Sequence, residues 1–397
     1  MVEMINLNKT YQVLLVLLSF LMPLTVFGAN LIIAIICILW LISGNYKSKY
    51  HQIISNRLML ASIVFFCLHV LGLLWTEDLI WGLHIVHKMW YFLLLLPVLY
   101  TIVKKDNISL YISAFLLAIT LTEITSYLVW FEVIEPFKNA TVKNPTPFMS
   151  HISYNPILAF SIYLVAHQLF FNKDLTKIKL LIYGFLASSM TINMFITGGR
   201  AGQVMFFAMI AILIFQIFNY KKLKAFVVIS IVIPLIFFIA YQTSSIFQNR
   251  VDLTIHNIAN FSENQNTSIG ERFVFNINSL EIIKQHPFFG VGTGDFKVEY
   301  KRVNEVNTPY MANAAHPHNM YTLVLVQLGL LGLLSMLSIF YFQIKLSFNE
   351  KNKYLRDVGL TLPLLFLVIM LSDSYLLGHF TTLMYVFFSS FLYQKFE

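Results

Sequence analysis

The chain has 397 residues, of which 58% are hydrophobic and only 12% are charged, and its mean hydropathy is +0.71. A soluble domain carries roughly twice that charged fraction, so the composition excludes an ordinary soluble protein. The net charge is +8, but Lys and Arg cluster in short linkers between apolar runs. This is the positive-inside pattern of membrane proteins, which interact with lipids, and it requires no nucleic-acid partner.

Apolar runs of about 20 residues recur along the whole chain and predict an all-α polytopic membrane protein with about twelve transmembrane helices. The basic linkers all fall on one face if both termini are cytoplasmic. Cys37 and Cys67 lie inside apolar runs without metal-binding spacing, so we interpret them as packing residues. The spans are predicted near residues 11–28, 29–44, 58–75, 83–103, 108–131, 155–171, 178–196, 201–218, 225–242, 319–344, 357–372 and 375–393.

The first two spans depend on a turn inside a long apolar run. Residues 11–43 are too long for one span, and Pro23 and Gly28 allow the chain to reverse. A cleavable signal peptide is the alternative interpretation of the first run. Three segments follow: helices 1–9 in residues 1–242, a periplasmic loop domain in 243–318 between spans 9 and 10, and helices 10–12 in 319–397.

The large loop is predicted to contain an amphipathic helix. Ser268 and Glu271 have capping-box spacing, and Pro287 should end the helix. The glycine-rich segment that follows, residues 287–294, contains two aromatic residues and suits contact with a membrane surface. The apolar residues at helical spacing are Phe273, Ile277, Leu280 and Ile283.

Arg200 is the only basic residue in the short hairpins predicted on the outer side, and it lies between glycines in Thr197–Gly202. Glycines let the backbone approach a ligand closely, and the start of the following helix presents free N–H groups. Arg adds a permanent bidentate donor for phosphate. Contact with lipid head groups is the alternative role.

Arg272 and His318 are the next candidates. Arg272 lies in the first helical turn of the loop, where a bound anion would be favoured; a solvated surface Arg is the alternative. His318 precedes Asn319 and a predicted helix start, where the positive potential favours a neutral imidazole that can act as a general base. His316 and His318 could instead contribute to a metal site, but the loop has no HExxH motif or adjacent carboxylate pair.

Other ionisable residues near the predicted outer face count as candidates because such groups are costly in membranes. Lys88 lies with His84 and His87 near the outer end of the fourth span. Each of these groups could equally satisfy a neighbouring helix. The remaining candidates are His151, Asp373 and His379.

Three segments in this order resemble the O-antigen ligase and polymerase superfamily of bacterial envelope enzymes. They are Thr197–Arg200; Arg272 followed by the segment 287–294; and Pro317–Tyr321 running into the segment 327–332. The resemblance covers about residues 195–345, with O-antigen ligase favoured. The family often has Glu where this chain has Gln327, so we assign Gln327 no role.

The resemblance implies a glycosyltransferase of the bacterial inner membrane that works at the periplasmic face. A glycan on undecaprenyl pyrophosphate would pass to the lipid A–core of lipopolysaccharide, with inversion and with neither metal nor cofactor. His318 would deprotonate the acceptor, and Arg200 and Arg272 would hold the pyrophosphate. Lys88 and His316 are further candidates for substrate binding.

The alternatives are an O-antigen or capsule polymerase, a protein O-oligosaccharyltransferase, and a polysaccharide flippase or transporter. The first two use the same donor with a different acceptor. A transporter would place ionisable residues along a path near the bilayer midplane, whereas here the unusual charges gather at the predicted outer face.

Overall fold

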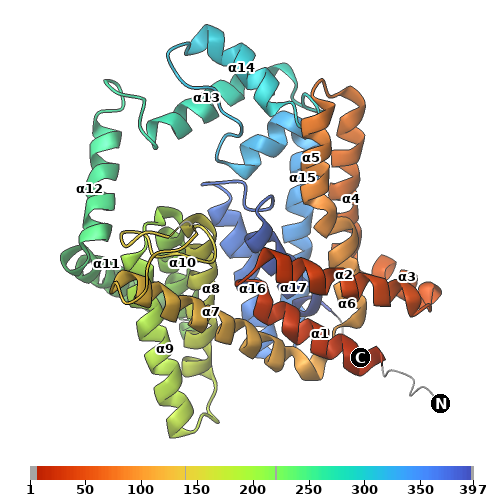
Figure 1. Cartoon of the computed structure of the whole chain (residues 1–397), viewed down its shortest axis with the longest axis vertical. Coiled ribbons are helices and arrows are strands. Elements are labelled where there is room, and N and C mark those ends of the chain that lie inside the picture. The colour runs from red at the N-terminus through yellow and green to blue at the C-terminus, as the bar shows by residue number, and fades with distance from the viewer. Residues whose placement is uncertain (1–6, 139, 220, 395–397) are drawn as a thin grey trace. The chain divides into compact units, whose positions relative to one another are not determined.

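The computed structural model describes residues 7–138, 140–219 and 221–394, and these ranges contain seventeen α-helices and no β-strand (Figure 1). The all-α prediction is confirmed. A bilayer favours this solution because a helix satisfies its backbone hydrogen bonds within one segment. The predicted cytoplasmic location of both termini concerns chain ends that lie outside the described ranges.

Seven helical segments in the described ranges are long and apolar enough to cross a membrane, and one bent pair of helices would make eight. Each of the seven coincides with a predicted span. They are Arg57–Trp75 (α4 with a 3₁₀ turn), Leu79–Ile102 (α5 and α6), Lys105–Trp130 (ending in α7), Lys177–Ile196 (α9), Arg200–Phe218 (α10), Lys222–Thr243 (α11) and Met320–Phe348 (α15).

The other predicted spans correspond to helices that do not meet this criterion singly. α1 (Leu7–Leu21) has 15 residues and α17 (His379–Leu392) has 14; at about 1.5 Å per residue neither reaches across a bilayer core of roughly 30 Å. α2 (Val26–Ile42) and α3 (Tyr46–Ser55) are bent by 116°. The count of twelve therefore stays a prediction. The last two predicted spans that do not meet the criterion correspond to α8 (His151–Phe171) and α16 (Lys353–Ile369).

Contacts divide the chain into two compact units, which we describe separately. The first unit comprises residues 1–13, 33–105 and 254–397, in which α15 packs against α4, α13 and α16. The second comprises residues 14–32 and 106–253, in which α10 packs against α8 and α11. The predicted division at residues 242 and 318 concerns the sides of a membrane and stays a prediction.

The large loop forms three helices, α12 (Ser245–Ala259), α13 (Gly270–Gln285) and α14 (Phe296–Asn307). α13 occupies the predicted position and ends before Pro287, but Thr267 Oγ1 caps it by accepting from the Gly270 N–H. The expected apolar stripe is largely on the surface: Phe273, Ile277 and Leu280 are each more than half exposed. The buried face of α13 consists of Val274, Phe275, Asn278, Ser279 and Ile282.

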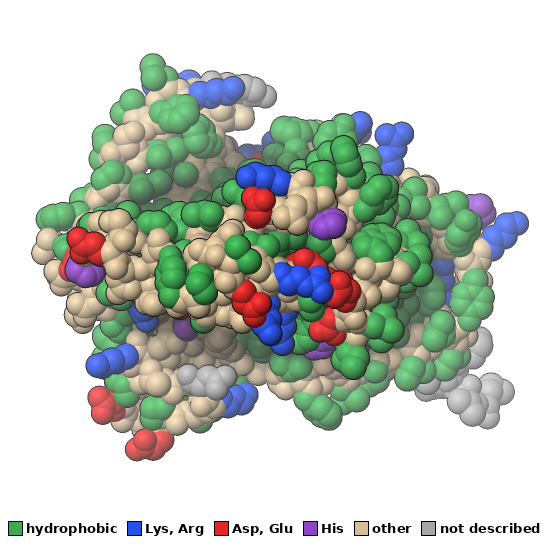
Figure 2. All heavy atoms as spheres, turned by 90° about the horizontal axis from the view of Figure 1, so that it is seen from above, with side chains coloured by type: hydrophobic (Ala, Val, Ile, Leu, Met, Phe, Trp, Pro, Cys, Tyr) green, Lys and Arg blue, Asp and Glu red, His purple; other side chains and the backbone are tan. Residues whose placement is uncertain are grey.

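α14 carries charges of both signs on its outer face. Lys301 pairs with Glu305, and Arg302 pairs with Glu299 and with Glu77 of the hairpin between α4 and α5. Figure 2 looks onto the face above α14, where red and blue side chains gather among apolar ones. Exposed ion pairs of this kind contribute little energy, so buried contacts must hold the loop helices.

Asp295 supplies such a contact. Its side chain is 2% exposed and accepts hydrogen bonds from Thr76 Oγ1 at 2.6 Å, the Glu77 N–H at 2.7 Å and the Asp78 N–H at 2.8 Å. A carboxylate that accepts several N–H bonds is strongly stabilised. Asp295 therefore ties the start of α14 to the turn before α5.

The segment 287–294 fills a break in α15. Gly329 has φ 61° and ψ −157°, which interrupts the helix. The N–H groups of Val291 and Gly292 donate to the carbonyls of Val326 and Gln327 at 2.9 and 3.0 Å. The Leu330 N–H donates to the Pro287 carbonyl at 2.8 Å. The predicted surface aromatic residues are present, since Phe288 and Phe289 are exposed, but the glycines pack against protein backbone.

We predict that Gly329→Ala destabilises the protein. A side chain there meets a positive φ, and its Cβ would overlap the Phe288 backbone. The two effects should cost about 2 kcal/mol or more, measured as a lower thermal unfolding midpoint in detergent. Gly184→Ala is the control, since its Cβ has no neighbour within 4 Å. An unchanged midpoint for Gly329→Ala would contradict the structural role of the break.

Candidate active site

His318 lies immediately before the cap of α15. Asn319 Oδ1 accepts from the N–H groups of Tyr321 and Thr322 at 2.9 and 3.2 Å, as expected of a helix N-cap. His318 itself has φ 51°, in the left-handed region that non-glycine residues rarely adopt. Such a backbone persists only where surrounding contacts impose it, and these positions concentrate at functional sites.

Asp373 and His316 are the closest polar partners of His318. His318 Nδ1 lies 3.4 Å from Asp373 Oδ2, and His316 Nδ1 lies 3.7 Å from Asp373 Oδ1. The two imidazole rings are 4.1 Å apart between centroids, and the His318 N–H donates to His316 Nδ1 at 3.3 Å. The Ser374 N–H donates to Asp373 Oδ1 at 2.7 Å. The carboxylate is therefore held facing both rings.

The electrostatics of this group favour an ionised carboxylate beside a neutral His316. Burial by itself would raise the pKa of Asp373, but hydrogen bonds from His318 and Ser374 and the nearby imidazoles bring it below its ordinary value. Burial lowers the pKa of His316, and the neighbouring His318, Arg272 and Lys88 add to this despite the opposing charge of Asp373. Arg272 and Lys88 thus act electrostatically on His316, and their predicted role in substrate binding stays a prediction.

α13 supports the histidines through one face. Phe275 lies almost parallel to the His318 ring, with 6.3 Å between centroids. Asn276 Nδ2 donates to the Pro317 carbonyl at 3.1 Å, while Asn276 Oδ1 accepts from Thr322 Oγ1 at 2.7 Å. Because residues three or four apart share a helix face, the same face brings the half-buried Arg272 toward this group.

His379 contacts Tyr91 rather than His316, His318 or Asp373. Its Nδ1 lies 2.7 Å from the Tyr91 hydroxyl, in the same unit as His318. We define the histidine cluster as His316, His318 and Asp373, with Arg272 and Lys88 as its neighbouring cations.

In the second unit, the glycine loop before α10 is held by amide side chains. Asn144 Oδ1 accepts from the Gly198 N–H at 3.1 Å, and Asn155 Oδ1 accepts from Thr197 Oγ1 at 2.9 Å. Gly199 approaches Asn155 so closely that a Cβ would lie 2.7 Å from its amide carbon. The glycines therefore serve close packing, and Arg200 begins α10 on a fixed support.

Two arginines act on His151 beside this loop. Asn144 Nδ2 lies 2.7 Å from His151 Nδ1. Burial lowers the pKa of His151, and the charges of Arg250 and then Arg200 lower it further. Arg250 also extends to the loop, since its Nη2 would lie 3.1 Å from a Cβ at Gly198. We define the arginine loop as residues 197–200 with Arg250, His151 and Asn144.

An apolar cavity of about 540 Å³ adjoins the arginine loop. It lies among the ends of α7, α9 and α11, within the second unit, and residue 196 leads directly into Thr197. Ser244 at its edge donates from Oγ to the Phe195 carbonyl at 2.7 Å. Its apolar lining includes Trp130, Ile192, Phe195, Ile196, Ile236 and Ile239.

The histidine cluster has the donor set of a metal site. One donor atom each from His316, His318 and Asp373 lies within 4.8 Å of the others. Two imidazoles and a carboxylate suit zinc or iron. However, the charges of Arg272 and Lys88 act on this group and oppose a divalent cation. The fit is therefore partial, and chelation must test it.

The fold and these groups define a polytopic membrane protein with clustered arginines and a histidine–carboxylate pair. Residues 185–337 match the family model described as O-antigen ligase. This match supports the predicted resemblance to the O-antigen ligase superfamily. The matched region contains Arg200, Arg250, Arg272 and His318, whereas Lys88, His151 and Asp373 lie outside it.

A curated protein of Haemophilus influenzae, described as an uncharacterized protein, is 30% identical over 220 residues. The aligned region is 50% of this chain and 53% of that protein, so the chain spans about half the length of the curated relative it matches.

Sequence reasoning did not single out Arg250 or Asn144, and it left Asp373 without a partner. Asp373 lies 55 residues after His318, and Arg250 lies 50 residues after Arg200. No local motif connects such pairs. The only sequence signal for Asp373 was its unusual position as an acid between two apolar runs.

We predict a pH-dependent stability that involves His151. Because its folded pKa is lowered, its contribution is complete above the unfolded value of about 6.5 and is lost as the pH falls toward the folded value. The thermal unfolding midpoint should therefore fall with pH below about 6.5, and less steeply in His151→Gln. His286→Gln, at an exposed position, should keep the wild-type slope. Equal slopes for all three proteins would contradict the prediction.

Proposed function

We propose that the protein transfers a glycan from undecaprenyl pyrophosphate to the lipid A–core of lipopolysaccharide, as an O-antigen ligase. The observation that carries the proposal is the His318–Asp373 pair at the start of α15. His318 lies inside the matched family region, Asp373 lies outside it, and the charge of Arg272 acts on the same cluster. The chain would act in the bacterial inner membrane with its active site at the periplasmic face.

His318 would serve as the general base. In the proposed tautomer Nδ1–H donates to Asp373 Oδ2, which leaves Nε2 free to accept a proton. The acceptor hydroxyl would give that proton to Nε2 while its oxygen bonds to the anomeric carbon from the side opposite the pyrophosphate. The bond from that carbon to the phosphate oxygen breaks, and the pyrophosphate leaves with the electron pair. The product is an inverted glycoside.

Positive charge would replace a metal at the leaving group. Arg200 and Arg272 are the residues that the family resemblance assigns to the pyrophosphate, and we add Arg250 because it reaches the arginine loop. Arginine binds phosphate oxygens in a bidentate manner and keeps its charge at every relevant pH. Lys88 and His316 would contribute to substrate binding beside His318.

The apolar cavity next to the arginine loop supports a lipid-linked donor. A polyprenyl chain is a flexible hydrocarbon, and its transfer from water or polar surroundings to an apolar site is favourable. An apolar cavity whose lining residue Ile196 directly precedes the arginine loop matches a ligand with a hydrocarbon tail and an anionic head. A soluble sugar nucleotide has no hydrocarbon chain that could fill an apolar lining of this kind.

An O-antigen or capsule polymerase would use the same donor and the same base. A protein O-oligosaccharyltransferase would differ only in its acceptor. Reconstitution with one lipid-linked glycan donor and three acceptors (lipid A–core, a second lipid-linked glycan and a protein) separates the three. Modification of lipid A–core supports the ligase. Transport of the donor across vesicles without any transfer would instead support a flippase.

We predict that His318→Ala lowers single-turnover glycan transfer by about 10²–10⁴-fold, the usual contribution of a positioned base. Donor binding should remain near normal because the arginines are unchanged. His316→Ala should have a much milder effect, since His316 supports the His318 backbone and faces Asp373 but takes no proton in the proposed reaction. The measurement is product formation from pre-bound donor by purified protein.

Chelation completes this experiment. EDTA should leave wild-type transfer intact if the cluster works as a base and carboxylate. Loss of activity in both histidine variants together with EDTA inhibition would support a metal site at His316, His318 and Asp373 instead. An active His318→Ala with an inactive His316→Ala would assign the base to the other histidine.

We also predict that Thr243→Trp, which narrows the apolar cavity, raises the KM for a long-chain polyprenyl donor roughly tenfold, equivalent to about 1.4 kcal/mol, because the indole takes volume that the lipid chain would fill. The kcat and the KM for a short-chain soluble donor should change little. Leu235→Trp is the control, because this residue is exposed on α11 and does not line the cavity. Equal KM values for the Thr243→Trp and wild-type proteins would place the lipid chain elsewhere.

A further inference from the structure

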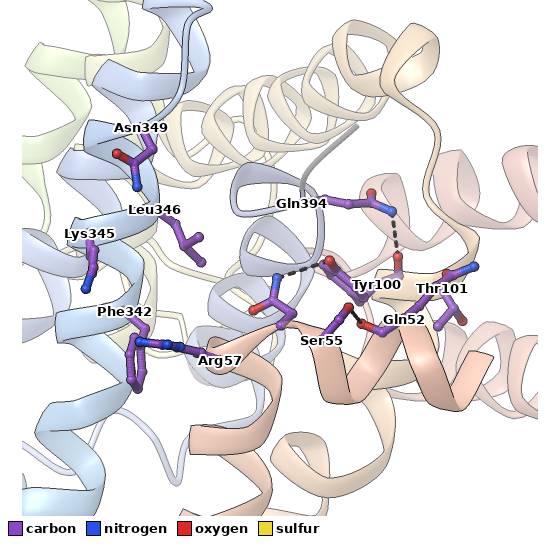
Figure 3. Close-up of a pocket in the computed structure, with 11 residues that line it drawn as sticks. Gln52, Ser55, Arg57, Tyr100, Thr101, Phe342, Lys345, Leu346, Asn349 and Gln394 are labelled. Carbon is purple, nitrogen blue, oxygen red and sulfur yellow. Dashed lines mark hydrogen bonds between the residues drawn. The ribbon is translucent and has the colours of Figure 1, made fainter. Parts of the chain in front are cut away.

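A second cavity, lined by polar residues, lies in the first unit at the end of α15 away from His318. It has a volume of about 880 Å³, within the range of roughly 300–1,000 Å³ typical of small-molecule sites. Figure 3 shows residues of α3, α4, α6 and α15 around it, together with Gln394 near the end of the chain. α15 is 29 residues long, about 40 Å at 1.5 Å per residue, so this cavity is separate from the histidine cluster.

The back wall of the cavity is a hydrogen-bonded network. Asn56 Nδ2 donates to the Tyr100 hydroxyl at 3.1 Å and to the Tyr393 carbonyl at 3.2 Å, while Asn56 Oδ1 caps α4. Gln394 Nε2 donates to the Tyr100 carbonyl at 3.0 Å (Figure 3). Because Asn56 and Tyr100 are both buried, these groups form a fixed polar surface.

One acceptor in this wall has no partner. Gln394 Oε1 is buried and makes no hydrogen bond within the described structure. A buried polar atom without a partner costs about 1–3 kcal/mol, and Gln394 lines the cavity, so a rotation of this side chain that brings its oxygen to a donor in the cavity would be favourable. A hydroxyl group would satisfy it.

The cavity also has two permanent positive charges. Arg57 begins α4, where the helix dipole adds positive potential, and Lys345 comes from α15. No Asp or Glu among the described residues lines the cavity. Gln52, Ser55 and Asn349 add further hydrogen-bonding groups. Such a lining suits an anion with several oxygen atoms, above all a phosphate.

The neighbouring surface is apolar and belongs to membrane-spanning segments. Phe342 and Leu346 line the cavity on α15, and both α4 and α15 are candidate spans. Phospholipid head groups lie at the ends of such spans, with their acyl chains along the apolar helix surface. A phosphate in this cavity could therefore remain attached to a lipid.

We propose that this cavity binds the phosphate of an anionic phospholipid with a glycerol head group. Arg57 and Lys345 contact the phosphate oxygens, and a head-group hydroxyl donates to Gln394 Oε1. The acyl chains leave along α15 past Phe342. The site does not depend on the proposed transferase function, because none of its residues belongs to the histidine cluster or the arginine loop.

The test is thermal unfolding of the purified full chain in a neutral detergent, titrated with dioctanoyl phosphatidylglycerol, dioctanoyl phosphatidylcholine or inorganic phosphate. Phosphatidylglycerol should raise the midpoint in a saturable way, and phosphatidylcholine should not. The double variant Arg57→Gln/Lys345→Gln should bind phosphatidylglycerol at least about tenfold more weakly than wild type, since two charged hydrogen-bond donors are lost. Gln394→Leu should weaken phosphatidylglycerol binding without creating affinity for phosphatidylcholine.

The matched control is Lys47→Gln/Lys104→Gln, which removes two exposed basic residues outside the cavity; its affinity should equal that of wild type. If the double cavity variant does not fold, Lys345→Gln alone provides the comparison. Saturable stabilisation by inorganic phosphate would support the phosphate site and assign it to a soluble phosphate compound. Wild-type affinity in the cavity variants, or no stabilisation by either anion, would overturn the proposal.

Discussion

The first unit depends on how the break in α15 is hydrogen-bonded. Gly329 leaves the helical conformation, and in an apolar environment the freed carbonyls need other donors. Backbone N–H groups of Val291 and Gly292 provide them. The segment that supplies these donors directly follows α13, so this pairing also places α13 beside the start of α15. Phe275 and Asn276 then reach His318 and Pro317.

Electrostatic arrangement distinguishes the two groups of candidate residues. In the histidine cluster a carboxylate faces two imidazoles, which suits the acceptance of a proton, while the nearby cations favour the neutral ring of His316 before the reaction. In the arginine loop two guanidinium groups act on a histidine whose pKa is lowered by burial and by their charges, which suits an anionic ligand.

The same physical logic applies to the cavity lined by Arg57 and Lys345, without any link to catalysis. Basic residues at the ends of transmembrane helices are usually explained by topology alone. Here the two side chains line one cavity together with Gln394, whose buried amide oxygen has no hydrogen-bond partner in the described structure. A topological signal and a lipid-binding site can therefore use the same residues.

The sequence alone determined the all-helical class, the seven helices that are long and apolar enough to cross a membrane, α13 and the resemblance to the O-antigen ligase superfamily. These features depend on local hydropathy, helix signals and short motifs. It also identified Arg200, Arg272 and His318 as candidates. Only the tertiary structure decided that Asp373 faces His318, that Arg250 reaches the Gly198 loop, and that Phe273 lies on the exposed side of α13. These contacts join residues far apart in the chain, and hydropathy cannot tell a helix face that meets protein from one left on the surface.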